Sequence, residues 1–168
     1  MDIVIRPVEP GEYAELGEIT AQAYLLDGLL DFGESDAYLG RLRDVAGRAA
    51  AAEVLVAVER GTVLGGVAFV PGPGPMADLA EPGEAEIRML AVARAGRGRG
   101  AGEALVRACL DRARGLEGCR RIVLSTQRSM RSAHRLYERL GFVRCPERDW
   151  NPVPDLSDVM LLTYELTL

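Results

Sequence analysis

A glycine-rich turn is the first place in the sequence where residue types and spacing suggest a chemical task. Four glycines alternate with other residues just before a helix-like segment, and two arginines lie among them. They are Gly96, Gly98, Gly100 and Gly102, with Arg97 and Arg99. The first amides of a helix lack intrahelical partners and carry partial positive charge, and glycine lets a ligand approach them closely. Arginine adds charge-assisted donors. The turn therefore predicts an anion site, most simply for a diphosphate.

Two other interpretations of this turn remain open at this stage. The glycines alone are also consistent with a flexible, solvated turn in a chain rich in glycine and arginine. Residues 96–101 satisfy the loose dinucleotide pattern G-x-G-x-x-A as well. A dinucleotide site, however, needs an acidic residue at the end of the next strand to bind the ribose. That strand ends in Ser125, Thr126 and Gln127, which argues against the dinucleotide interpretation.

Alternating and helical spacings predict the elements that must position this turn. The expected strands cover residues 2–8, a hairpin over 54–70, 84–92, 120–126, 142–145 and 158–168. The expected helices cover residues 13–24, 39–49 with Ser35 or Asp36 as cap, 101–114 and 131–140. The order β-α-α-β-β-β-α-β-α-β-β indicates a mixed α/β fold with a strand–helix–strand unit in its middle. Without an internal repeat or a linker, residues 1–168 are expected to form a single domain.

Composition excludes several classes of function. The chain has 168 residues, 48% of them apolar, and a net charge of −5, which argues against a general binder of nucleic acid or anionic membranes. All 20 basic residues are arginine, so Schiff-base lysine chemistry and the P-loop lysine are excluded. Three scattered cysteines, Cys109, Cys119 and Cys145, form neither a disulfide nor a zinc pattern. With no signal peptide or membrane-length apolar run, a cytoplasmic protein without a metal is expected.

A second motif makes the turn more specific. The segment AHRLYERLGF, residues 133–142, lies one strand downstream of VARAGRGRGAGEAL, and the pair resembles the GNAT superfamily of acetyl-CoA-dependent N-acetyltransferases. The phosphate loop of that family, Arg/Gln-x-x-Gly-x-Gly/Ala, is matched by Arg97, Gly100 and Gly102. The resemblance covers the whole chain in element order and is specific in sequence from about Glu84 to Phe142. It implies a GNAT-type mixed sheet of about seven strands with helices on both faces.

The resemblance also implies roles for the residues around the turn. The cofactor-binding positions would be Leu90, Ala91, Val92, Arg97, Gly98, Arg99, Gly100, Ala101 and Gly102. The amides of residues 97–102 would hold the diphosphate of acetyl-CoA. The backbone of residues 90–92, beside a bulge usual in this strand, would pair with the pantetheine arm, and an amide near Leu90 would polarise the thioester carbonyl. Many relatives carry Asn where this chain has Met130, so that side-chain contact with the cofactor is not expected.

Tyr137 is the predicted proton donor. Acylation of an amine by a thioester needs an unprotonated amine, a polarised carbonyl and a proton for the departing thiolate, but no metal and no covalent intermediate. The phenol, with an ordinary pKa near ~10, holds a proton at neutral pH and can give it to sulfur. The alternative is that Tyr137 only packs in the core, because it lies on the apolar stripe of Leu136 and Leu140.

The general base is expected on the strand before the turn. Glu84, Glu86 and Arg88 alternate there and share one face. Charges on a central strand are costly unless they are paired or face a cavity. They could form a Glu–Arg ion pair at the end of the sheet, or supply a carboxylate that accepts the amine proton directly or through water. We favour Glu86 over Glu84 as base because it lies nearer the expected thioester.

Three further features have a structural and a functional interpretation. His134, the single histidine, is more simply a helix-surface residue than a substrate contact. Trp150 could cover an edge of the core or form a wall of the acceptor pocket. The acidic stretch 27–36, with Asp149, Asp155 and Asp158, could attract a cationic amine or form a solvated rim.

Together these observations predict an N-acetyltransferase that moves acetyl from acetyl-CoA to an amine by direct attack in a ternary complex. The acceptor is a small-molecule, peptide or protein amine, and an oxygen acceptor stays open. The rivals are a non-catalytic CoA-binding module and a dinucleotide-binding oxidoreductase domain. A nucleic-acid or membrane partner is not expected, whereas a homodimer is possible as a family expectation.

Overall fold

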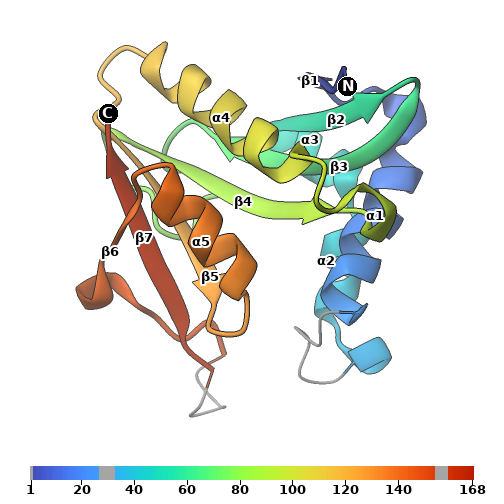
Figure 1. The fold of residues 1–168 in the computed structure, drawn as a ribbon. Helices are drawn as coiled ribbons and strands as arrows, with labels where there is room; N and C mark the ends of the chain where they lie inside the picture. Colours follow the sequence, from blue (N-terminus) through green and yellow to red (C-terminus); the bar gives the residue numbers. More distant parts are fainter. Residues whose placement is uncertain (1, 27–32, 154–158) are drawn as a thin grey trace.

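The strands of the computed structural model form one mixed sheet, and the structure describes residues 2–26, 33–153 and 159–168. The order of the strands is β1-β2-β3-β4-β5-β7-β6. Their bounds are β1 (Val4–Pro7), β2 (Glu53–Glu59), β3 (Thr62–Val70), β4 (Glu84–Val92), β5 (Arg121–Gln127), β6 (Val143–Arg144) and β7 (Leu161–Thr167). The predicted α/β class with a seven-stranded mixed sheet is confirmed (Figure 1).

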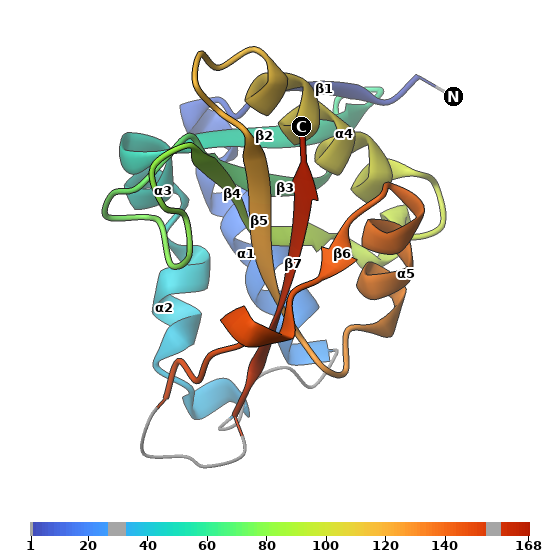
Figure 2. The ribbon, with the colours of Figure 1, turned by 90° about the vertical axis from the view of Figure 1, so that its left-hand side faces the viewer.

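Helices cover both faces of this sheet. One face carries α1 (Tyr13–Leu26), α2 (Tyr38–Arg43) and α3 (Val45–Ala51), and the other carries α4 (Ala101–Arg114) and α5 (Arg131–Arg139) (Figure 2). Short 3₁₀ helices are η1 (Pro10–Glu12), η2 (Gly33–Ser35), η3 (Arg94–Gly96) and η4 (Pro146–Arg148). Successive side chains of β2 point to opposite faces of the sheet and join the hydrophobic core on each face. Val54 and Val56 pack with Leu16 of α1, whereas Leu55 packs in the cluster that includes Leu105 of α4.

The predicted helix over residues 39–49 is in fact two helices, which is a correction to the sequence-based boundaries. The chain breaks at Asp44 (φ −82°, ψ 69°), whose Oδ1 accepts a hydrogen bond of 2.9 Å from the Gly47 amide and so caps α3. The buried Arg48 closes the break by donating to the carbonyl oxygens of Arg41 and Leu42. The expected cap, Ser35 or Asp36, is not the N-cap residue of α2, which is Ala37; Asp36 lies one residue earlier, where its Oδ1 accepts a hydrogen bond from the Tyr38 amide at 2.9 Å.

The first helices lie close together because α1 carries a glycine where α2 crosses it. A Cβ on Gly17 would lie 2.6 Å from the carbonyl oxygen of Arg43, closer than nonbonded atoms allow. The side chains of α1 and α2 thereby reach the same part of the sheet, above β4. None of the helices within the described ranges is long and apolar enough to cross a membrane.

Candidate active site

A bulge in β4 is the first element of the site. Gly66 pairs with Ala91 and Ala68 pairs with Arg88, so Val67 alone lies opposite both Met89 and Leu90. Met89 takes a positive φ of 54° at this point, a conformation that is unfavourable for a non-glycine residue. Beyond the bulge, β3 and β4 approach so closely that a Cβ on Gly65 would lie 2.4 Å from the Ala91 carbonyl oxygen. The bulge turns the backbone of residues 90–92 relative to the first half of β4.

Next to the bulge, β4 and β5 separate. Their parallel pairing runs from Glu84 with Arg121 to Ile87 with Leu124 and then ends. β5 continues along β7 as far as Gln127, whereas β4 continues along β3 to Val92. The two strands therefore diverge, as Figure 1 shows. Among the described strands, none pairs with the β5-facing edge of residues 88–92, so its polar groups can bind an extended ligand as an added strand would.

The glycine-rich turn connects this edge to α4. Gly98 (φ 76°) and Gly100 (φ 84°) take left-handed conformations, and a Cβ on either would meet no atom within 4 Å. Within the described part of the chain, the amides of Gly100, Ala101 and Gly102 have no hydrogen-bond partner. Open space beside unpartnered amides at a helix start fits a diphosphate. The structure brings the predicted residues 97–102 together in this turn.

The two arginines of the turn do not have equivalent environments. The guanidinium of Arg99 forms an ion pair with Glu59 of β2, so its charge is already engaged within the protein. Arg97 is exposed; it directly follows η3 and precedes the two left-handed glycines. The sequence could not identify Glu59 as a partner, because the two residues are 40 positions apart.

Tyr137 lies where α5 packs against the end of β5. Its ring is 5% exposed and contacts the rings of Phe142 (5.7 Å) and Tyr164 (6.0 Å). Burial raises the pKa of the Tyr137 phenol, as do the neighbouring Tyr24 and Cys109. The hydroxyl makes no hydrogen bond with another described residue, yet Tyr137 is one of the residues lining a pocket. The phenol thus keeps its proton and faces the pocket from within the core.

Glu86 is buried in the middle of β4, with 1% of its surface exposed. Its Oε1 accepts three hydrogen bonds of 2.8–3.0 Å from the amides of Asp78, Leu79 and Ala80. Burial raises the pKa of the Glu86 carboxyl, and the amide bonds only partly oppose that shift. Glu86 therefore holds the loop before β4 in place and also borders the pocket.

Neither glutamate of this strand pairs with Arg88, contrary to the ion pair considered from the sequence. Glu84, 2% exposed, is bound by Arg148 through both carboxylate oxygens at 2.9 Å and by Arg121 at 2.8 Å. Arg88 instead pairs with Asp78 at 3.0 Å and donates to the Met76 carbonyl oxygen at 2.9 Å. Glu84 is thus a charged residue with a structural role at the start of β4, and its carboxylate is already occupied by two arginines. Glu86 remains the candidate for the general base.

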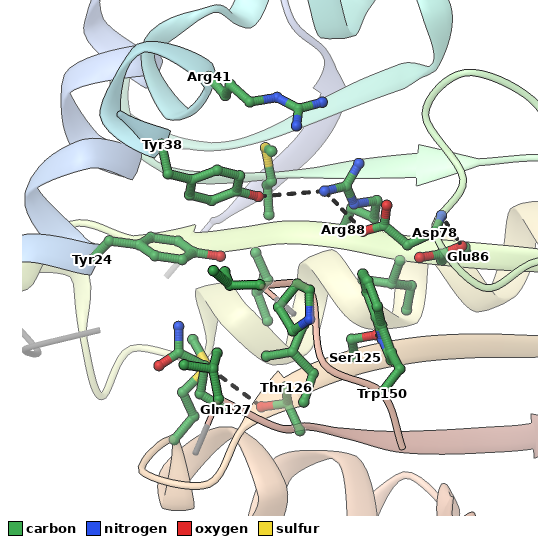
Figure 3. Close-up of a pocket in the computed structure, with 18 of the residues that line it drawn as sticks. Tyr24, Tyr38, Arg41, Asp78, Glu86, Arg88, Ser125, Thr126, Gln127 and Trp150 are labelled. Carbon is green, nitrogen blue, oxygen red and sulfur yellow. Dashed lines mark hydrogen bonds and ion pairs between the residues drawn. The ribbon is translucent and has the colours of Figure 1, made fainter. Parts of the chain in front are cut away.

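The pocket has a volume of about 410 Å³ and lies between β4, β5 and the α1–α2 pair. Figure 3 shows Tyr24, Tyr38 and Arg41 at one end, and Glu86, Ser125 and Trp150 at the other. Trp150 donates from its ring nitrogen to Ser125 Oγ at 2.9 Å, so it forms a wall of the pocket, one of the two positions considered for it. Among the lining residues that sequence reasoning missed as site residues are Tyr24, Tyr38, Arg41 and Asp78.

Two other predicted features, His134 and the acidic residues, contribute little to the described pocket lining. A ring nitrogen of His134 lies 2.9 Å from the Gln127 carbonyl oxygen, and the ring contacts that of Tyr164 at 5.6 Å, so it is not among the described residues that line the pocket. Most of the acidic stretch 27–36, with Asp155 and Asp158, lies outside the described residues. Asp36 lines the pocket, whereas Asp149 pairs with Arg144 at 2.9 Å.

Comparison with known families agrees with this geometry. The model of the acetyltransferase (GNAT) family matches residues 18–142, which include both motifs, β4 and the separated strands. The chain belongs to the GNAT family. This membership confirms the predicted enzyme class, an acyl-CoA-dependent N-acetyltransferase, and argues against the oxidoreductase interpretation. A search of curated proteins finds no match.

Solved GNAT structures share the whole fold. The Salmonella typhimurium protein yncA, solved with its cofactor acetyl-CoA, is 23% identical with a TM-score of 0.73, covering 99% of this chain and 94% of its own. A GCN5-related N-acetyltransferase from Kribbella flavida is 26% identical with a TM-score of 0.69 and coverages of 99% and 98%. A phosphinothricin acetyltransferase from Sinorhizobium meliloti, in complex with acetyl-CoA, is 18% identical with a TM-score of 0.72 and coverages of 100% and 89%.

Proposed function

We propose that this GNAT protein transfers acetyl from acetyl-CoA to an amine acceptor by direct attack in a ternary complex. The observation that carries the proposal is the opening between β4 and β5, which lies between the unpartnered amides of the turn and the pocket. Acetyl-CoA supplies an activated thioester. The amides of Gly100, Ala101 and Gly102 bind its diphosphate, the edge of residues 90–92 binds its pantetheine arm, and the pocket receives the acceptor.

Each remaining chemical task falls to a residue at this opening. An amide near Leu90 donates to the thioester carbonyl oxygen and stabilises the negative charge that develops on it. Glu86, with a raised pKa, accepts the proton of the attacking amine directly or through water. Tyr137 donates its hydroxyl hydrogen toward the departing sulfur. Because an enzyme and a CoA-binding module would both bind acetyl-CoA, release of free thiol in the presence of an amine panel, above the background with cofactor alone, is the test that separates them.

The role of Glu86 can be separated from its hold on the loop by a Glu86→Gln substitution. The glutamine oxygen still accepts the three loop amides but cannot take a proton, so kcat/KM at neutral pH is expected to fall about 100-fold or more with little change in Tm. In the unmodified protein kcat/KM should rise with pH as the Glu86 carboxyl loses its proton at its raised pKa. This rise in the pH profile should be absent in the Glu86→Gln variant. Unchanged kcat/KM and pH profile would leave Glu86 with a structural role only.

The turn is tested by Gly100→Ala. The left-handed conformation at Gly100 costs a non-glycine residue about 1–2 kcal/mol, which the chain can relieve by moving the turn and misaligning its amides. Acetyl-CoA affinity, measured by calorimetry, should therefore fall about tenfold. Gly118→Ala is the matched control, because Gly118 has a similar φ of 79°, has open space around it and follows the other end of α4. Equal loss of affinity in both variants would contradict the proposed diphosphate site.

A further inference from the structure

Most charged side chains of the pocket are engaged within the protein. Arg88 is bound by Asp78, and Asp36 accepts the Tyr38 amide at the start of α2. Glu86 holds three loop amides through Oε1. The guanidinium of Arg41, in contrast, forms no ion pair and no hydrogen bond within the described ranges of the chain.

Arg41 is exposed to solvent but is one of the residues that line the pocket. It belongs to α2, lines the pocket, and its guanidinium carbon lies 6.0 Å from the centre of the Tyr38 ring. The buried Arg48 donates to the Arg41 carbonyl oxygen at 2.6 Å and so fixes the backbone of this turn of α2. In Figure 3 Arg41 lies beside Tyr38 at the end of the pocket opposite Glu86. A positioned guanidinium without a counter-ion can bind a carboxylate or phosphate group.

The phenols beside Arg41 strengthen this assignment. The Tyr38 hydroxyl oxygen lies 3.4 Å from a nitrogen of Arg88, and the ring centres of Tyr38 and Tyr24 are 6.4 Å apart. Burial raises the pKa of the Tyr24 phenol, so that hydroxyl keeps its proton as a donor. A ligand group at this end therefore meets a cation and hydroxyl donors, whereas the second ammonium of a diamine would meet the repulsion of Arg41.

We propose that the acceptor is an amine that also carries an anionic group, as an amino acid does, and that Arg41 binds this anion. The inference rests on the proposed acetyl transfer and names the acceptor class for it. The two ends of the pocket then have complementary tasks. Arg41 fixes the anion at the α2 end, which directs the amine toward Glu86, Leu90 and Tyr137. The acceptor would be a free amino acid or an amino phosphonate analogue, rather than a polyamine or a protein lysine.

The test compares acceptors that differ only in the anionic group. The twenty standard amino acids, their amides and their decarboxylated amines are assayed with acetyl-CoA by thiol release, and the phosphonate analogue of the best substrate distinguishes carboxylate from phosphonate. We expect the anionic member of the best series to have the highest kcat/KM. Arg41→Gln should raise KM for that member about 10- to 100-fold, and leave the KM of its decarboxylated partner and of acetyl-CoA unchanged.

Arg43→Gln is the matched control. Arg43 is the next arginine of α2, but it pairs with Glu18 at 2.6 Å outside the pocket, so its loss should change no acceptor KM. Three outcomes would overturn the anion site. The enzyme could prefer the amides or the decarboxylated amines over the amino acids, Arg41→Gln could affect the KM of all three kinds of acceptor equally, or none of the three could be acetylated. Failure of the protein to bind acetyl-CoA would instead contradict the proposed function itself, which separates the two failures.

Discussion

Replacing Tyr137 by phenylalanine is expected to lower kcat for acetyl transfer about 100-fold or more while leaving the Kd for acetyl-CoA unchanged. The substitution removes one oxygen and keeps the ring packing with Phe142 and Tyr164. Loss of a positioned acid typically costs a factor of about 100 to 10,000. Because burial raises the pKa of Tyr137, the phenol acts chiefly as a hydrogen-bond donor to the developing thiolate. We therefore expect no alkaline limb from it in the pH profile below pH ~10.

Tyr164→Phe provides the control for this prediction. Tyr164 is also buried, contacts Tyr137 and donates to Glu138 at 3.0 Å, but it is not one of the described residues that line the pocket. Its loss should change Tm and leave kcat unaltered. If Tyr137→Phe retains full kcat at saturating acceptor, Tyr137 is a packing residue, and the thiolate takes its proton from solvent.

Replacing Glu84 by glutamine is expected to lower the free energy of unfolding by about 3 kcal/mol at pH 7. The carboxylate is 2% exposed and bound by Arg148 and Arg121, and removal of one partner of a buried ion pair costs about 3–5 kcal/mol. Denaturant titration measures the change. Glu103→Gln is the control, because Glu103 also faces two arginines, Arg107 and Arg139, but at the surface, where solvent screens the ion pairs and a much smaller loss of stability is expected.

The effect of Glu84 should depend on pH. Burial favours its neutral form, but the hydrogen bonds from Arg148 and Arg121 prevail and lower its pKa to about 2. In the unfolded chain a glutamate has a pKa near ~4.3. The contribution of Glu84 is therefore complete above that value and is lost as the pH falls toward 2. The stability difference between the unmodified protein and Glu84→Gln should shrink over this interval, and a constant difference would contradict the ionic origin of the effect.

The helices α2 and α3 show where sequence periodicity stops being informative. The stripe of Leu39, Leu42 and Val45 predicts one helix, yet Asp44 breaks it. Two contacts favour the break: the cap from Asp44 to the Gly47 amide and the bonds from Arg48 to the carbonyl oxygens that end α2. The residues for both were visible in the sequence, but their geometry depends on packing against α1.

The chemistry of β4 illustrates the same difference. Alternation correctly places Glu84, Glu86 and Arg88 on one face, but all three find partners outside the strand. Glu84 is bound by Arg148, 64 positions away, Glu86 by loop amides, and Arg88 by Asp78. Such partners depend on how η4 and the loop over residues 71–83 return to the strand, which no local spacing encodes.

The sequence by itself determined the class of the fold, the order of its helices and strands along the chain, the glycine turn and the family, because these depend on local periodicity, helix starts and contiguous motifs. Only the tertiary structure decided how β4 and β5 separate, which charges are engaged, and that Tyr24, Tyr38 and Arg41 meet Glu86 and Trp150 at one pocket. The physical reason is that side chains from several helices, strands and loops, far apart in the sequence, converge there. Their charges and hydrogen bonds are set by neighbours that are distant in the chain.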